Sequence, residues 1–349
     1  MLMETGQQPP GNAAHESHVA LFRTPGLFWD VLLHDCKAAR QTIHIDHYIL
    51  RNDQIGKRLT EILIERAQSG VKIDMLLDRV GSREAYGTPM IRSLRDAGAN
   101  IRFYNNLFLF HLFTPSKWFP RNHVKTILID QAIMYVGSAC LADDMAQWRD
   151  VHLKIAGPAV PHMLQQKSQD LRYAVSKPHL KRNPIYQELL GRINNAQTSI
   201  QLVTPYFLPP IRLRRALKRA VKRGVDVKIM LGRQTDVPFA NCVSVSFFPS
   251  LLMKGIKILA YTPRVFHAKY MIIDDSWATI GSCNLDYLSL FRNREANLMI
   301  TDTDLINRLK VQFSEDEQEC EKIDMVFYHN LPIWYKFLAY AGRSVKHFL

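Results

Sequence analysis

The stretch that decides the fold is HVKTILIDQAIMYVGS at residues 123–138, which recurs as HAKYMIIDDSWATIGS at residues 267–282. Both copies have the spacing His-x-Lys-x4-Asp-x6-Gly-Ser. Each reads as two apolar strands joined by a turn at the aspartate. Residues two apart on a strand point to the same face, and the second strand returns towards the first. Each hairpin therefore gathers an imidazole, an ammonium and a hydroxyl at one edge, a set that can hold a phosphate and supply a nucleophile.

The segments that precede the two motifs repeat the same order of elements. In the first half, strands are expected at residues 42–50, 71–77 and 100–104, and the helices between them end near Gly70 and Gly98. In the second half, strands are expected at residues 199–208, 225–231 and 256–261, and the helices end near Gly224 and Gly255. Alternating strands and helices predict an α/β fold with a mixed sheet flanked by helices in each half. The predicted boundaries are a first domain at residues 17–176, a junction at Ser176–Pro184, a second domain at 184–325 and a tail at 326–349.

Composition limits the partners and the compartment. The chain has 349 residues, 45 Lys and Arg against 32 Asp and Glu, and a net charge of +13, which favours an anionic partner such as nucleic acid, an anionic membrane or a phosphate-bearing substrate. The five cysteines form no Cys-x-x-Cys pair, which argues against a disulfide framework and a zinc site. The polar N-terminus lacks a signal-peptide core, and no apolar run approaches the roughly 20 residues of a membrane-spanning helix. We therefore expect a peripheral protein on the cytoplasmic side of the cell membrane.

Two aromatic segments are candidates for contact with that membrane. From Tyr104 to His123 is 19 residues, but from Tyr261 to His267 is 6, so the first half carries 13 more residues before its motif. This insertion is rich in aromatic residues, namely Phe108, Phe110, Phe113, Trp118 and Phe119. It either folds back on the core or, as we favour, dips into lipid beside the motif. The tail, which includes Trp334, either docks on its own domain or lies as an amphipathic helix at a membrane surface.

The sequence resembles the phospholipase D superfamily and, within it, the bacterial cardiolipin synthases. The resemblance covers nearly the whole chain. Besides the paired motif, it rests on HYIL at 47–50, WRDVHLKIAGP at 148–158, TPYFLP at 204–209 and GSCNLDYLSLFRNREANL at 281–298. It implies two phospholipase D-like domains that are related by a pseudo-twofold axis and bring both motifs into one cleft.

The resemblance also implies a mechanism. One histidine attacks phosphorus to form a phosphohistidine, and the other protonates the leaving alcohol and then deprotonates the incoming one. In the family pattern His123 is the nucleophile and His267 the general acid and base, while Lys125 and Lys269 neutralise the non-bridging oxygens. Hydrogen bonds to the substrate are expected from Ser138, Ser282 and Asn284. No metal and no other cofactor is expected.

An attacking imidazole needs a carboxylate partner, and the chain offers four candidates. Asp130 and Asp274 belong to the motif and are included among the candidate catalytic residues, although their place past the end of a strand favours a turn role. Glu295, 13 residues after Ser282, matches the acid that orients histidine in the family, and Asp150 lies 12 residues after Ser138. The copies also differ, because Cys140 stands where the second copy has Asn284, so the halves are expected to bind phosphate unequally.

The function that this pattern favours is a phosphatidyltransferase that makes cardiolipin from two phosphatidylglycerol molecules and releases glycerol. The alternatives are a phospholipase D that yields phosphatidic acid and a nuclease or other phosphodiesterase of the same superfamily. The expected partner is an anionic phospholipid membrane that contains phosphatidylglycerol and cardiolipin, with no obligate protein partner. The aromatic segments argue against nucleic acid.

Overall fold

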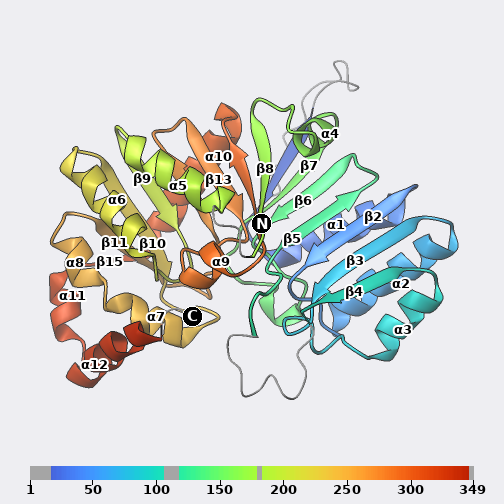
Figure 1. Cartoon of the computed structure of the whole chain (residues 1–349), viewed down its shortest axis with the longest axis horizontal. Helices are drawn as coiled ribbons and strands as arrows, with labels where there is room; N and C mark the ends of the chain where they lie inside the picture. The colour runs from blue at the N-terminus through green and yellow to red at the C-terminus, as the bar shows by residue number, and fades with distance from the viewer. Residues whose placement is uncertain (1–16, 106–117, 179–182, 346–349) are drawn as a thin grey trace.

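Two mixed β-sheets, one from each half of the chain, form the frame of the protein in a computed structural model (Figure 1). The structure describes residues 17–105, 118–178 and 183–345. The first sheet has the order β1-β7-β6-β5-β2-β3-β4. Its strands are β1 (His18–Phe22), β2 (Thr42–His47), β3 (Lys72–Asp78), β4 (Asn100–Tyr104), β5 (Lys125–Ile129), β6 (Ile133–Gly137) and β7 (His152–Ala156).

The second sheet has the order β15-β11-β10-β9-β12-β13-β14-β8. Its strands are β8 (Leu171–Ser176), β9 (Ser199–Val203), β10 (Asp226–Gly232), β11 (Lys257–Tyr261), β12 (Tyr270–Ile273), β13 (Trp277–Gly281), β14 (Glu295–Ile300) and β15 (Cys320–Ile323). Apart from the edge strand β15, each strand matches one of the first sheet, so that β9 corresponds to β2 and the β12–β13 hairpin to the β5–β6 hairpin. The predicted repeat is confirmed.

The matching order moves the domain boundary from where the sequence placed it. The first domain was predicted to end at Ser176, but β8 pairs antiparallel with β14 of the second sheet. Its counterpart β1 pairs in the same way with β7 of the first sheet. The predicted junction at Ser176–Pro184, of which residues 179–182 lie outside the described structure, therefore joins two elements of the second domain. The change of domain falls between α4 (Ala159–Leu164) and β8.

Most of the helices cover one face of each sheet. In the first domain these are α1 (Pro25–Ala38), α2 (Gln54–Gln68) and α3 (Pro89–Asp96). In the second they are α5 (Pro184–Asn195), α6 (Ile211–Lys222), α7 (Pro238–Val245) and α8 (Phe248–Leu252). The helix expected to run to Gly255 is thus two short helices, and Pro249 lies in the first turn of the second one. Gly70 and Gly224, which follow α2 and α6, have φ of +90° and +92°, the left-handed conformation that ends helices.

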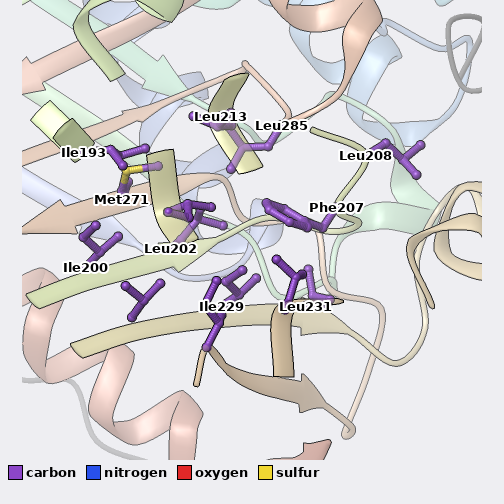
Figure 2. Packing of buried hydrophobic residues seen from close by; sticks show 14 of the residues in the cluster. Ile193, Ile200, Leu202, Phe207, Leu208, Leu213, Ile229, Leu231, Met271 and Leu285 are labelled. Atoms are coloured by element: carbon purple, nitrogen blue, oxygen red, sulfur yellow. The ribbon is translucent and has the colours of Figure 1, made fainter. Parts of the chain in front are cut away.

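The apolar cores follow from this layering. Alternate residues of β2 are buried, as expected for a strand with one helix-covered face. Figure 2 shows part of the second core, to which Leu202 of β9, Ile229 of β10 and Leu213 of α6 all contribute. A further cluster joins the two domains and includes Val136 of β6 and Ile280 of β13. This shared core, to which α10 (Thr303–Gln318) contributes, holds the two hairpins beside each other.

The tail is helical and docks on the second domain. After α11 (Met325–Asn330), helix α12 (Ile333–Ala341) packs against α7 and buries Ala339 completely. Its other face leaves Trp334 66% and Phe337 76% exposed. The interpretation that the tail docks on its own domain is therefore confirmed. The helix also presents an aromatic surface, and its contact with a membrane stays a prediction. Within the described ranges, no helix is both long and apolar enough to cross a membrane.

Candidate active site

The two motif histidines lie just before β5 and β12, each next to an isolated β-bridge that joins the two domains. The backbone N–H of His123 donates to the carbonyl oxygen of Arg294 over 2.9 Å, and that of His267 donates to the carbonyl oxygen of Arg149 over 2.8 Å. Each histidine is therefore held by a residue of the other domain. These reciprocal contacts are those of a pseudo-twofold relation between the domains.

The carboxylate partners are also exchanged between the domains. Nδ1 of His123 lies 2.9 Å from Oε2 of Glu295, which begins β14 of the second domain. Nδ1 of His267 lies 2.8 Å from Oδ2 of Asp150, which precedes β7 of the first domain. Both carboxylates are buried, with 0% and 1% of Glu295 and Asp150 exposed. Because each ring donates from Nδ1, its Nε2 is left for the reacting atoms.

The environment of His123 determines its charge state. Burial lowers the pKa of His123 to about 4, with Glu295 opposing the shift and Lys125 adding to it. His123 is therefore neutral near pH 7, as an attacking imidazole must be.

In the second pair, the environment determines the charge state of the carboxylate. Burial alone would raise the pKa of Asp150, but His267, Lys269 and a hydrogen bond from Ser138 together hold the pKa of this carboxyl well below its usual range. Asp150 is ionised and can stabilise a positive charge on His267.

Two buried lysines supply the positive charge of the site. Nζ of Lys125 donates to the carbonyl oxygen of His123 over 3.0 Å, and Nζ of Lys269 donates to that of His267 over 2.5 Å. They are 1% and 2% exposed. Burial lowers the pKa of Lys269 to about 8, although Asp150 and Asp236 oppose this shift. Two ammonium groups with few protein acceptors suit the non-bridging oxygens of a phosphodiester.

The two motif serines have a role that the sequence did not predict. We expected their hydroxyls to bind the substrate, but Ser138 Oγ donates to Asp150, and Ser282 Oγ donates to Glu295 over 2.5 Å. Both serines are fully buried. A hydroxyl has one proton to donate, and each serine donates it to the carboxylate that orients a histidine.

The motif aspartates lie in the hairpin turns and bind backbone. Asp130 accepts hydrogen bonds from the backbone N–H groups of Arg40, Gln41 and Thr42. Asp274 accepts the equivalent bonds from three consecutive residues, 197–199. Both have a left-handed φ, 51° and 52°. Their inclusion among the catalytic candidates is therefore corrected, since each ties a hairpin to the strand before it.

Position 140 makes the two copies unequal. Nδ2 of Asn284 donates to the hydroxyl of Tyr206 over 3.0 Å, while its buried Oδ1 has no partner among the described residues. Cys140 is 2% exposed, and burial raises the pKa of its thiol to about 11, so it stays protonated.

Sequence reasoning missed several groups around the rings. The ring of Tyr48 meets the His123 ring edge-on at 4.7 Å between centroids, and Trp148 meets His267 in the same way at 5.6 Å. Both aromatics stand in segments that carried the resemblance, which is the one signal that could have marked them. Asp236, whose Oδ2 is 3.9 Å from Nε2 of His267, was missed because no motif contains it. The aromatic insertion lies mostly outside the described residues, so that its predicted contact with lipid stays a prediction.

Comparisons with known proteins agree with this geometry. A family model described as "Cardiolipin synthase, PLD-like domain" matches residues 32–167 and 189–317. A cardiolipin synthase of Geobacillus sp. (strain WCH70) is 31% identical over 91% of this chain and 70% of its own length. The major cardiolipin synthase ClsA of Bacillus subtilis (strain 168) is 29% identical over 90% of this chain and 72% of its own.

A solved structure supports the fold. The crystal structure of phosphatidylserine synthase from Haemophilus influenzae Rd KW20 superposes with a TM-score of 0.77 over 95% of each chain, at 13% identity. The two matched segments fall on the two sheets, and each contains one copy of the paired motif. The chain therefore belongs to the cardiolipin synthase family of proteins with phospholipase D-like domains.

Proposed function

We propose that this protein is a phosphatidyltransferase that makes cardiolipin from two phosphatidylglycerol molecules and releases glycerol through a phosphohistidine. The observation that carries the proposal is the crossed pair of histidines, each oriented by a buried carboxylate of the other domain beside two buried lysines. This arrangement supplies two imidazoles with distinct roles and cations for a single phosphodiester. The names of the matched relatives supply the substrate class.

The reaction proceeds in two displacements. Nε2 of His123 attacks the phosphorus of one phosphatidylglycerol, and the bond from phosphorus to the glycerol oxygen breaks while His267 gives that oxygen a proton. Glycerol leaves. A hydroxyl of a second phosphatidylglycerol then gives its proton back to His267, and its oxygen attacks phosphorus, so that the bond to His123 breaks and cardiolipin forms.

The charge states support this division of roles. His123 is kept neutral by burial and by Lys125, which suits a nucleophile. His267 lies between two carboxylates, Asp150 at Nδ1 and Asp236 near Nε2, and this position suits a general acid because both can stabilise a positive charge on the ring.

Labelled phosphatidylglycerol in liposomes tests the function. Cardiolipin and glycerol in equal amounts support the proposal, whereas phosphatidic acid would indicate a hydrolase. Cleavage of DNA without a lipid product would indicate a nuclease. His123→Ala and His267→Ala should each abolish the activity, and His34→Ala, an exposed histidine on α1, is the matched control. Turnover at the wild-type rate by either site variant would contradict a two-histidine mechanism.

The proposed partner is an anionic membrane, with peripheral binding on the cytoplasmic side. Supporting it are the net charge of +13 and the exposed Trp334 and Phe337 on α12. Replacing both aromatics by serine should weaken sedimentation with phosphatidylglycerol vesicles while the unfolding midpoint stays unchanged. Leu27→Ser, which removes a 61% exposed side chain on α1, is the control. Equal sedimentation of the tail variant and the control would contradict membrane contact by α12.

A further inference from the structure

An acidic side chain lies on the open side of one histidine. Oδ2 of Asp236 is 3.9 Å from Nε2 of His267, the nitrogen that Asp150 leaves free. The side chain of Asp236 is 28% exposed, whereas that of Asp150 is 2% exposed. Asp236 is therefore placed to meet a ligand, and Asp150 is not.

The loop that carries Asp236 is fixed to the segment that carries His267. It runs from the end of β10 at Gly232 to the start of α7. The carbonyl oxygen of Gln234 accepts a hydrogen bond from the backbone N–H of Phe266 over 3.0 Å. Nδ2 of Asn241 donates to the carbonyl oxygens of Gly232 and Arg233, each over 3.2 Å. The backbone positions of Asp236 and His267 are thus fixed relative to each other.

The first domain has no equivalent acid. Gly232 ends β10 as Asp78 ends β3, so that Asp236 corresponds in the repeat to Ser82. Ser82 is fully buried, and its hydroxyl donates to the carbonyl oxygen of Tyr48 over 2.9 Å. Across the described ranges, no carboxylate other than Glu295 pairs with His123. The open carboxylate is therefore particular to the side of His267.

The carboxylate of Asp236 affects which ligands the site favours. It repels the phosphate that the two lysines attract, since like charges at close range are unfavourable. It is favourable towards a ligand that brings hydroxyl donors, because a hydrogen bond to an ionised acceptor is stronger than one between neutral groups. In the proposed reaction, His267 is where the alcohol leaves and enters, and that alcohol is a glycerol with neighbouring hydroxyls.

We propose that Asp236 is a specificity-determining residue that accepts a hydrogen bond from a second hydroxyl of the glycerol headgroup while the reacting hydroxyl contacts Nε2 of His267. The inference rests on the proposed phosphatidyl transfer and names the class of alcohol: a vicinal diol in preference to a monohydroxy alcohol of the same length. Asp236 also offsets the burial of the Lys269 ammonium, so the test has to separate the two roles.

A competition between two alcohols makes that separation. Phosphatidylglycerol liposomes are given labelled glycerol and 1-propanol at equal concentration, and the ratio of labelled phosphatidylglycerol to phosphatidylpropanol is measured. The ratio does not depend on how much enzyme is active. Asp236→Asn should lower it about tenfold, as expected when a hydrogen bond to a charged group is lost. Asp236→Ser, which copies the first domain, should do the same. Asp275→Asn, which removes an exposed carboxylate paired with Lys310, should leave the ratio unchanged.

The outcomes are distinct. If both products form and neither Asp236 variant alters their ratio, the selection of a diol is refuted and Asp236 only balances charge. If the wild-type protein transfers phosphatidyl groups to no alcohol, the proposed function fails, and this inference fails with it.

Discussion

Replacing Asp150 by asparagine should separate the two chemical steps. The buried carboxylate accepts hydrogen bonds from Nδ1 of His267 over 2.8 Å, from Ser138 Oγ and from its own neighbour Val151 N over 2.8 Å. Asparagine keeps the shape but offers an amide where the imidazole needs a charged acceptor. A hydrogen bond to a charged group contributes about 1.5–3 kcal/mol. Loss of an oriented general acid costs about 10²–10⁴-fold in rate. We therefore expect phosphatidylglycerol turnover to fall by about 10³-fold.

A donor with a better leaving group should recover the first step only. p-Nitrophenolate leaves without a proton, so phosphatidyl-p-nitrophenol should still phosphorylate His123 in Asp150→Asn. The second step still needs His267 as a base. Stopped-flow absorbance should therefore show a burst of one nitrophenolate per active site, followed by slow turnover.

Glu295→Gln is the matched variant. Glu295 holds the nucleophile as Asp150 holds the acid, with the same pattern of contacts from a histidine and a serine. Its loss should slow the attack itself, so no burst is expected with either donor. A burst in Glu295→Gln and none in Asp150→Asn would reverse the assigned roles of the histidines. Bursts of equal size in both would refute the division of roles.

Three further predictions follow from the electrostatics and the packing. The rate should rise with pH as His123 loses its proton at about 4 and fall as Lys269 loses its proton at about 8; a pH–rate profile with no fall below pH 10 would contradict this reading. Asp274→Ala, which removes the acceptor of three backbone N–H groups, should lower the free energy of unfolding by about 2 kcal/mol and leave kcat within about twofold, as compared by urea titration and by assay. Arg149→Met should lower the free energy of unfolding by about 3–5 kcal/mol in the same titration, because the buried Asp316 then keeps, among the described residues, only the 3.3 Å contact from Arg23, and adding Asp316→Leu should recover most of the loss; no recovery would contradict the ion-pair explanation.

The fold could be predicted because its signals are local. Strand and helix periods alternate along the chain, and residues such as Gly70 and Gly224 mark helix ends through a conformation that other residues rarely adopt. The paired motif also placed its two aspartates in turns, because they follow a buried strand and precede another. What local patterns predicted less well were the ends of elements, such as β2, which stops at His47 before the predicted Leu50.

The features that the sequence did not predict depend on how the two domains lie against each other. Nothing near His123 in the sequence indicates that its carboxylate is Glu295, 172 residues away, rather than the nearer Asp150. The motif hydroxyl of Ser138 is equally compatible with a substrate and with a carboxylate until Asp150 is placed beside it. Asp236 was missed for the same reason, since its loop reaches His267 only through the folded sheet. Edge strand β8 was assigned to the wrong domain because pairing of an edge strand leaves no periodic signal.

The exchange of side chains between the domains has a consequence for how the two sides of the reaction can differ. Two identical subunits around a twofold axis would also trade a histidine for a carboxylate, but every substitution would then appear twice. Here both halves belong to one polypeptide, so one copy has Asn284 and the other Cys140, and Asp236 faces a single histidine. Because the two halves are covalently linked, they keep the geometry of a symmetric pair although their residues differ. A phosphodiester bound between the halves would contact different side chains on its two sides. This difference allows the two half-reactions to be unlike and to follow a fixed order.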